Sequence, residues 1–205
     1  MIRADRLSKT YGPARALTDL SLEVAQGETV GVQGPPGSGR STLLKIVATL
    51  LPPSSGRLEI GGVDAAAHPY EVRRQLFWVG ARGQNAPDSR AGDYLSLVHS
   101  TRRGRPIARV DLRAALAAAG TREDTRVCEL SASERALLNL AAAQLSGADV
   151  VLIDDVFSDA GSDCSARCLP ALREARQRGV TMLLALGQDA TIPEFCSRVI
   201  ELPRG

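Results

Sequence analysis

The sequence lacks several features that would point to a membrane, metal or redox protein. No apolar run approaches the ~18 to 20 residues needed to cross a bilayer, and the first residues lack the apolar segment of a signal peptide. The four cysteines and two histidines show neither a CxxC nor an HExxH spacing, which disfavours a zinc or redox site. We therefore expect a cytoplasmic protein whose thiols are structural.

The chain also has little excess charge of either sign. The 25 basic and 23 acidic residues leave a net charge of +2, too little for the broad positive field that binds nucleic acid. The basic residues are 23 arginines and only two lysines, Lys9 and Lys45. With 44% hydrophobic and 23% charged residues, the 205-residue chain has a globular composition. We expect no nucleic-acid partner.

Short apolar segments alternate along the chain with segments of helical periodicity. The predicted strands cover 2–7, 21–24, 28–33, 76–79, 150–153, 180–186 and 198–202, with a hairpin-like segment around 56–62. The predicted helices cover 41–49, 69–74, 88–103, 109–119, 131–145 and 164–178. This alternation favours an α/β fold in which helices cover both faces of a parallel sheet. We expect one domain, residues 1–205, with a core of 1–80 and 146–205 and a helical insert at about 81–145.

A glycine-rich loop, GPPGSGRST at residues 34–42, joins a predicted strand to a predicted helix. Its spacing is that of the GxxxxGK[ST] phosphate loop, in which backbone N–H groups and a helix N-terminus surround a polyphosphate. Proline has no N–H, so the donors come from residues 37–42. The candidate nucleotide-binding residues are Gly34, Gly37, Ser38, Gly39, Arg40, Ser41 and Thr42. The Ser41 hydroxyl is a candidate Mg²⁺ ligand.

Arg40 departs from this pattern, because the loop normally carries a lysine there. Arginine is a planar fork of five donors and does not occupy the space of a compact ammonium group. We expect the exchange of lysine for arginine to impair stabilisation of the transition state more than it impairs phosphate binding.

Two further motifs match a known family. LSASE at residues 130–134 stands where that family has a Leu-Ser-Gly-Gly-Gln signature, and VVLIDD at 150–155 matches its four apolar residues plus Asp-Glu. With these motifs the chain resembles the ATP-binding cassette (ABC) subunits of membrane transporters over nearly its whole length. The resemblance implies a P-loop NTPase fold of ABC type, with a mainly parallel sheet flanked by helices, a small antiparallel β part and a helical subdomain. It also implies ATP and Mg²⁺ as ligands.

The resemblance assigns roles to particular residues. Tyr11 stands where the family has an aromatic residue that stacks on adenine, and Asp154 stands where an aspartate holds Mg²⁺. Asp155 replaces the glutamate that activates water and is one methylene shorter, which makes it a weakened base or a structural acid. The signature positions are Ser131, Ala132, Ser133 and Glu134. Alternatively, residues 131–134 form an ordinary capping box that stabilises the start of a helix.

Three more family positions have lost their chemistry in this sequence. The family's glutamine after the strand at 76–79 aligns with Ala81, although Gln84 lies nearby. The histidine after the last central strand aligns with Gly187. The aspartate of the loop after the strand at 150–153 aligns with Gly161, which Asp159 and Asp163 flank.

The resemblance, together with these departures from the family pattern, implies a degenerate ATP-binding subunit with impaired hydrolysis. Its expected partners are membrane-embedded permease subunits and a second ABC subunit, either a copy or a paralogue, which would place it on the inner face of the cell membrane. One alternative is a competent ABC ATPase with compensating residues. Another is a small P-loop kinase or GTPase, which the absence of an NKxD motif and the presence of the signature disfavour.

Overall fold

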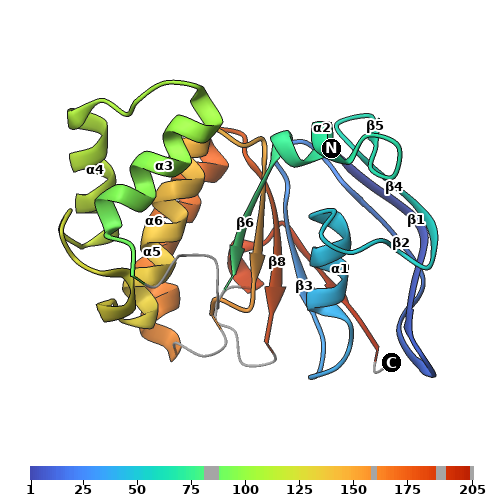
Figure 1. Ribbon diagram of the computed structural model, residues 1–205. Coiled ribbons are helices and arrows are strands. Elements are labelled where there is room, and N and C mark those ends of the chain that lie inside the picture. The colour runs from blue at the N-terminus through green and yellow to red at the C-terminus, as the bar shows by residue number, and fades with distance from the viewer. Residues whose placement is uncertain (81–87, 158–160, 188–192, 204–205) are drawn as a thin grey trace.

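In the computed structural model, which describes residues 1–80, 88–157, 161–187 and 193–203, nine strands form two sheets (Figure 1). The strands are β1 (Ile2–Tyr11), β2 (Ala14–Val24), β3 (Thr29–Gln33), β4 (Ser55–Ile60), β5 (Val63–Asp64), β6 (Leu76–Gly80), β7 (Val150–Asp154), β8 (Thr181–Leu186) and β9 (Arg198–Glu201). The helices are α1 (Arg40–Val47), α2 (Pro69–Gln75), α3 (Ala91–Arg103), α4 (Arg109–Ala119), α5 (Ala132–Ser146) and α6 (Gly161–Gln177), with short 3₁₀ turns η1 (Val127–Glu129) and η2 (Pro193–Phe195).

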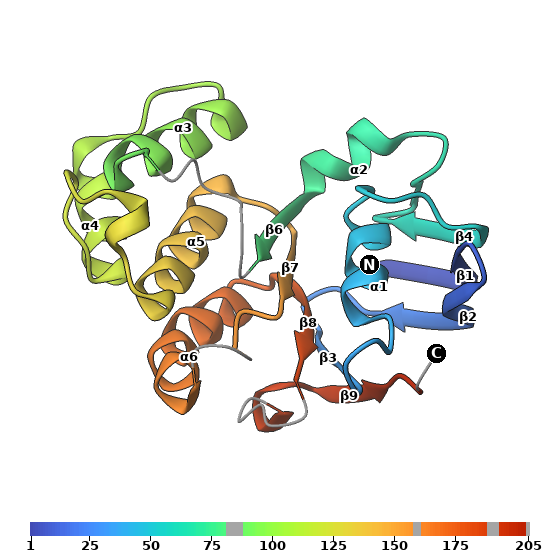
Figure 2. The same cartoon turned by 60° about the horizontal axis from the view of Figure 1, so that its bottom comes forward.

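The larger sheet is parallel, as the sequence predicts. Its strand order is β6-β7-β8-β3-β9, and every neighbouring pair runs in the same direction. The register pairs Gly80 with Asp154 and Asp154 with Ala185, while Gln33 pairs with Leu186. The carboxyl ends of these strands therefore meet at one edge of the sheet, which Figure 2 turns toward the reader.

Helices cover both faces of this sheet, and β7 shows why its sequence is apolar throughout. Val150 and Leu152 pack into the cluster that includes α1, whereas Val151 and Ile153 pack into the cluster that includes α5 and α6. Successive side chains of a strand point to opposite faces, so a strand buried on both faces needs apolar residues at every position.

The smaller sheet is antiparallel, with strand order β2-β1-β4-β5. The predicted strands at 2–7 and 21–24 were too short, because the β1–β2 hairpin continues to a turn between Tyr11 and Ala14. Side chains in this outer arm are largely exposed, and the pairing is interrupted by register shifts where Arg6 and Asp19 adopt positive φ. An exposed, irregular hairpin has no regular alternation of apolar residues for sequence analysis to detect.

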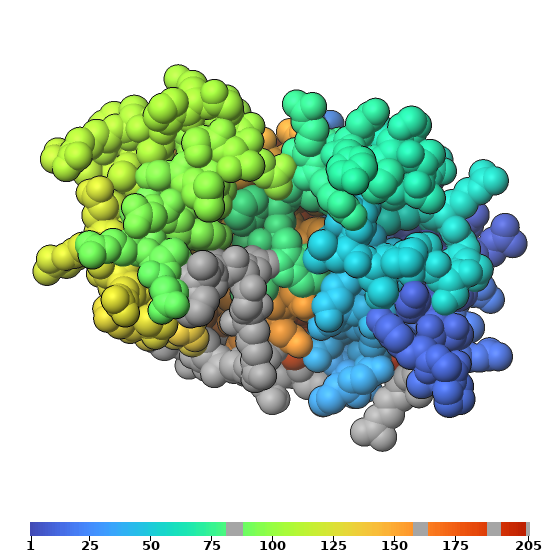
Figure 3. Space-filling view, in the orientation of Figure 1, coloured from blue at the N-terminus to red at the C-terminus, as the bar shows by residue number. Residues whose placement is uncertain are grey.

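Helices α3, α4 and α5 pack together beside the parallel sheet, and α5 also contacts α6 and β6. Ten of the fifteen residues of α5 are buried, consistent with a helix surrounded by neighbours. In Figure 3, α3 and α4 lie on one side of a hollow, and the elements around α1 and the antiparallel sheet lie on the other. No helix within the described ranges is long and apolar enough to cross a membrane.

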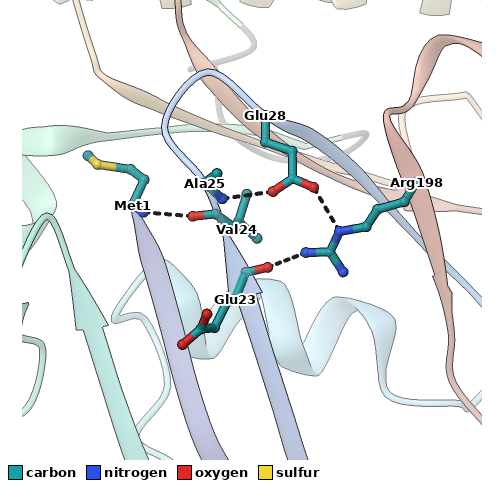
Figure 4. Close-up of polar contacts among 6 residues, drawn as sticks. All are labelled: Met1, Glu23, Val24, Ala25, Glu28 and Arg198. Carbon is teal, nitrogen blue, oxygen red and sulfur yellow. Dashed lines mark hydrogen bonds and ion pairs between the residues drawn. The ribbon is translucent and has the colours of Figure 1, made fainter.

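A cluster of polar contacts joins the two sheets near the amino end of β3 (Figure 4). Arg198 of β9 donates to the Glu28 carboxylate at 2.7 Å and to the carbonyl of Glu23 in β2. The second Glu28 oxygen accepts from Ala25 N at 2.7 Å, and Met1 N donates to Val24 O at 2.7 Å. Burial acts to raise the pKa of Glu28, but the hydrogen bonds from Arg198 and Ala25 outweigh it and hold the pKa below its ordinary value.

Candidate functional site

The glycine-rich loop lies between β3 and α1, at the carboxyl edge of the parallel sheet. Gly37 and Gly39 adopt φ values of 83° and 90°, a region that glycine enters without strain. A Cβ atom on Gly39 would lie 2.1 Å from the carbonyl oxygen of Ala16 in β2. A Cβ atom on Gly37 would meet nothing within 4 Å, so the loop surface there is open. The backbone thus forms a curved cradle whose outer side can admit a ligand.

Helix α1 begins at this cradle and directs its free amide groups toward it. Its first helical hydrogen bond runs from Leu43 N to Gly39 O at 2.8 Å, so the N–H groups of residues 40–42 have no partner within the helix. These N–H groups and the positive end of the helix dipole favour an anion. Ser38 differs, because its N–H already donates to Pro35 O at 3.0 Å and the residue is only 3% exposed. Its buried hydroxyl has no hydrogen-bond partner within the described part of the chain.

Two oxygen groups proposed as Mg²⁺ ligands meet beside the cradle. The Ser41 hydroxyl donates to Asp154 Oδ1 at 2.8 Å, joining the first turn of α1 to the end of β7. Burial raises the pKa of the Asp154 carboxyl above its ordinary value, while the Ser41 hydrogen bond opposes the rise and the neighbouring Asp155 adds to it. A half-buried carboxylate beside a hydroxyl and a second acid suits a hard divalent cation. The residues present therefore fit a magnesium–phosphate ligand.

The Arg40 side chain is turned toward the ends of the neighbouring strands. Its guanidinium donates to the carbonyl oxygen of Leu186, the last residue of β8. The same nitrogen lies 3.4 Å from Asp155 Oδ1 in an ion pair. The Arg40 side chain is only 12% exposed, compared with 38% for Asp155. Sequence analysis missed the Leu186 carbonyl as a partner, because no side-chain pattern marks a backbone acceptor.

The backbone at Asp155 is unusual. Its φ is 52°, a left-handed conformation that non-glycine residues seldom adopt and that costs about 1 to 3 kcal/mol. Such conformations persist where the surrounding structure enforces them, and they concentrate at functional sites. Asp155 follows directly on β7, so its position is fixed by the strand and by the Arg40 pair.

The predicted signature segment forms the start of α5, and its capping-box interpretation is confirmed. The Glu134 carboxylate accepts from Ser131 N at 2.8 Å and from Ser131 Oγ at 2.7 Å, and Ser131 Oγ accepts from Glu134 N at 3.3 Å. The two hydrogen bonds that the carboxylate accepts, first the one from the Ser131 side chain and then the one from its backbone, lower the pKa of Glu134. Ala132 is exposed and Ser133 is buried in the helix packing.

The remaining predicted positions are exposed, lie at the ends of helices or strands, or fall outside the described residues. Tyr11 ends β1, is 49% exposed, and has Lys9 Nζ 5.5 Å from its ring centroid. Gly187 directly follows β8 and Gly161 begins α6. Ala81, Gln84, Asp159 and the side chain of Asp163 lie outside the described residues.

Comparison with known proteins finds a matching family and relatives of similar sequence. The profile of the family described as "ABC transporter" matches residues 17–158. The daunorubicin resistance ATP-binding protein DrrA3 of Streptomyces coeruleorubidus is 33% identical over 211 residues, which cover 100% of this chain and 66% of that protein. The lipoprotein-releasing system ATP-binding protein LolD of Bordetella pertussis is 31% identical over 216 residues, covering 100% of this chain and 94% of LolD.

The fold also matches solved structures. The ATP-binding cassette MJ0796, in a dimeric post-hydrolysis state bound to ADP and Pi, superposes with a TM-score of 0.89. It is 22% identical in sequence, and the match covers 100% of this chain and 95% of that one. At this identity the likeness establishes the architecture of the two sheets and their helices.

Proposed function

The chain belongs to the ABC transporter family, and on that premise we propose that it is an ATP-binding subunit that binds ATP with Mg²⁺ but hydrolyses ATP slowly. The open glycine cradle, the N-terminus of α1 and the Ser41–Asp154 pair support the binding half of the proposal. The engagement of Arg40 by Leu186 and Asp155 is the observation that supports the hydrolysis half.

In this proposal several residues of the loop and its surroundings have distinct tasks. The N–H groups of residues 37 and 39–42 bind phosphate oxygens, and Ser41 and Asp154 hold the metal. Gly34 supports the loop, because a Cβ there would lie 2.5 Å from Ser38 Oγ and 2.8 Å from Leu202 O. Tyr11 stands in the hairpin whose Ala16 carbonyl adjoins Gly39, and we propose that it offers its exposed ring to the base. Bound Mg²⁺ would neutralise charge on the phosphates.

Slow hydrolysis follows from what the other residues do. A base must reach its proton to within about 2.6 to 3.2 Å, and Asp155 is one methylene short and paired with Arg40. Gly187 offers no side chain beside the end of β8. Loss of one oriented catalytic donor typically reduces kcat by about 10² to 10³. The effects of several altered residues in one site are not additive, but all of them lower the rate of hydrolysis.

The start of α5 supports a weakened signature as well. In the family architecture this helix end meets the nucleotide of a second subunit. Here the Glu134 carboxylate accepts hydrogen bonds from Ser131 N and Oγ, so both donors of Ser131 serve an internal anion. We propose that the signature half of the site contributes little to phosphate binding in a partner.

The proposal extends to partners and organisation. We propose that the chain forms one nucleotide-binding domain, residues 1–205, with a core of 1–80 and 146–205 and a helical insert at about 81–145. It would work on the cytoplasmic, inner face of the cell membrane with permease subunits and a second ABC subunit. That LolD belongs to a lipoprotein-releasing system and MJ0796 forms a dimer supports this assembly.

The test compares binding and turnover in the purified protein. Calorimetric titration with MgATP should show binding that Asp154→Ala weakens. Phosphate release should be at least about 100-fold slower than that of a cassette with intact motifs measured in parallel. Asp154→Ala also reports contaminating ATPase, because it removes only activity that belongs to this site.

Two outcomes would contradict the proposal in different ways. Turnover that matches the intact cassette and disappears in Asp154→Ala would establish a competent ATPase with compensating residues. Absence of MgATP binding would remove the nucleotide-binding assignment itself. Adding the permease complex to the same assay tests whether partners raise the rate.

A further inference from the structure

The two substitutions at the centre of the site, Arg40 and Asp155, contact each other. They come from different elements, the first turn of α1 and the residue after β7, and their side chains form a 3.4 Å ion pair. Each was a separate departure from the family pattern in the sequence. In the structure the two substitutions are one feature, because the arginine side chain that replaces lysine contacts the aspartate that replaces glutamate.

The pair is held from two sides. Besides Asp155, the Arg40 guanidinium contacts the carbonyl oxygen of Leu186, and β7 and β8 are neighbouring parallel strands. A planar guanidinium offers five donors in a fixed fork and can serve both acceptors together. A lysine ammonium would bind these two acceptors together less well, since it is a point charge on a flexible stem.

The positions of both partners are tightly set. Arg40 is only 12% exposed, and Asp155 has a left-handed backbone with φ 52°. Within the part of the chain that the structure describes, Asp155, Lys45 and Arg40 all act electrostatically on the adjacent Asp154 carboxyl. Arg40 therefore has a preferred internal partner at the point where the loop would meet a phosphate.

We propose that Asp155 is a positioning residue that holds Arg40 away from the ligand, so that a phosphate group must compete with the Asp155 carboxylate for the guanidinium. This inference rests on the proposed nucleotide binding and assigns Asp155 a role in affinity. The Asp155 carboxylate then takes the place beside the Arg40 guanidinium that a phosphate would take. Because nucleotide binding has to replace this ion pair, removing the Asp155 charge strengthens the binding of nucleotide.

The size of the effect follows from the exposure of the pair. Exposed ion pairs contribute little, and the upper end of their range corresponds to about fivefold in an equilibrium constant. The low exposure of Arg40 places this pair at that upper end. Asp155→Asn should therefore bind a phosphate ligand about fivefold more tightly than the natural protein.

The experiment is a double-mutant cycle that uses the full chain and a Mg²⁺ complex of a non-hydrolysable ATP analogue. The four proteins are the natural chain, Asp155→Asn, Arg40→Met and the double variant, titrated calorimetrically at one salt concentration. Asp155→Asn should tighten binding in the natural background and have no effect in the Arg40→Met background. Asp155→Glu, which retains the charge, should stay within about twofold of the natural affinity.

A second readout needs no nucleotide. The same four proteins, unfolded by urea without ligand, should show a coupling between positions 40 and 155 that favours the natural pair. Asp111→Asn on α4 is the matched control, because it removes one exposed carboxylate far from the loop and should change neither quantity. If Arg40→Met unfolds, Arg40→Gln replaces it in both cycles.

The outcomes separate the inference from the function on which it rests. If the natural chain binds the analogue but Asp155→Asn does not tighten binding, the inference is wrong and the nucleotide-binding proposal stands. An equal tightening with Arg40 absent would also overturn it, because simple charge repulsion would then suffice. If none of the four proteins binds the analogue, the proposed function fails and the inference with it.

Discussion

Arg102 fastens helix α3 to the parallel sheet, and its replacement should be among the most destabilising surface changes in the chain. Its guanidinium donates to Arg73 O at 3.0 Å, to Arg74 O at 3.1 Å and to the carbonyl oxygen of Leu76. These carbonyls lie where α2 ends and β6 begins. Burial lowers the pKa of Arg102, and its guanidinium carbon lies 5.8 Å from the Phe77 ring centroid.

Arg102→Met tests this role, because methionine keeps an apolar stem and removes all the donors. A hydrogen bond to a charged group contributes about 1.5 to 3 kcal/mol, but freed carbonyls can bind water and the guanidinium regains hydration. The three bonds together therefore predict a loss of about 2 to 4 kcal/mol in the free energy of unfolding. In a chain of this length that lowers Tm by about 5 to 15 °C.

Arg103→Met is the matched control, because Arg103 is the next residue, is exposed and makes one 3.4 Å hydrogen bond to Leu145 O. Its replacement should change the free energy of unfolding by no more than about 0.5 kcal/mol. Both are measured by urea unfolding followed by circular dichroism. Equal midpoints for the two variants would refute the argument that Arg102 joins α3 to the sheet.

Three further changes test other parts of the structure. Gly39→Ala should cost at least about 2 kcal/mol more than Gly37→Ala in urea unfolding, because both have positive φ but only Gly39 would also meet a carbonyl at 2.1 Å. Asp154→Asn should raise the Tm of the nucleotide-free protein at pH 7, because burial disfavours the charged carboxyl, and an unchanged Tm would contradict this. Glu134→Gln should lower the Tm at pH 7. Because capping hydrogen bonds lower the pKa of Glu134, the stability that they give is present above its unfolded pKa of about 4.3 and is lost as pH falls through the lower folded pKa. The Tm difference should therefore disappear in acid, and a difference that is independent of pH would be inconsistent with this role.

The parallel sheet could be predicted because its strands are buried on both faces. Val150 to Ile153 are apolar at every position, and each is fully or nearly fully buried. The capping box could also be predicted, because Ser131 and Glu134 interact within one helical turn. In these cases the signal is local, so a short window of sequence contains all the interacting residues.

The contacts of Arg40 could not be predicted in the same way. Arg40 and its acceptor Leu186 are 146 positions apart, and only the order of β8, β7 and β3 in the sheet brings them together. Spacing could mark Arg40 and Asp155 as departures from a pattern, but not as partners. The outer arm of the β1–β2 hairpin escaped detection for a different reason, since exposed strands need no apolar alternation.

At both elements that we propose to bind phosphate, a donor group already contacts a carboxylate of the chain itself. Asp155 pairs with Arg40 at the glycine loop, and Glu134 accepts the hydrogen bonds of Ser131 at the start of α5. A donor that is paired internally is satisfied without ligand, and under the proposed function an external phosphate must compete with the internal carboxylate for that donor. The same contacts that stabilise the nucleotide-free fold should therefore oppose tight phosphate binding, as expected when stability and function compete for the same groups. It follows that replacing only Arg40 by lysine leaves the Asp155 carboxylate beside the proposed ligand. Replacing only Ala132 and Ser133 by glycine likewise leaves the Glu134 carboxylate in place. Recovery of an active cassette should require the internal anion and its partner to be changed together.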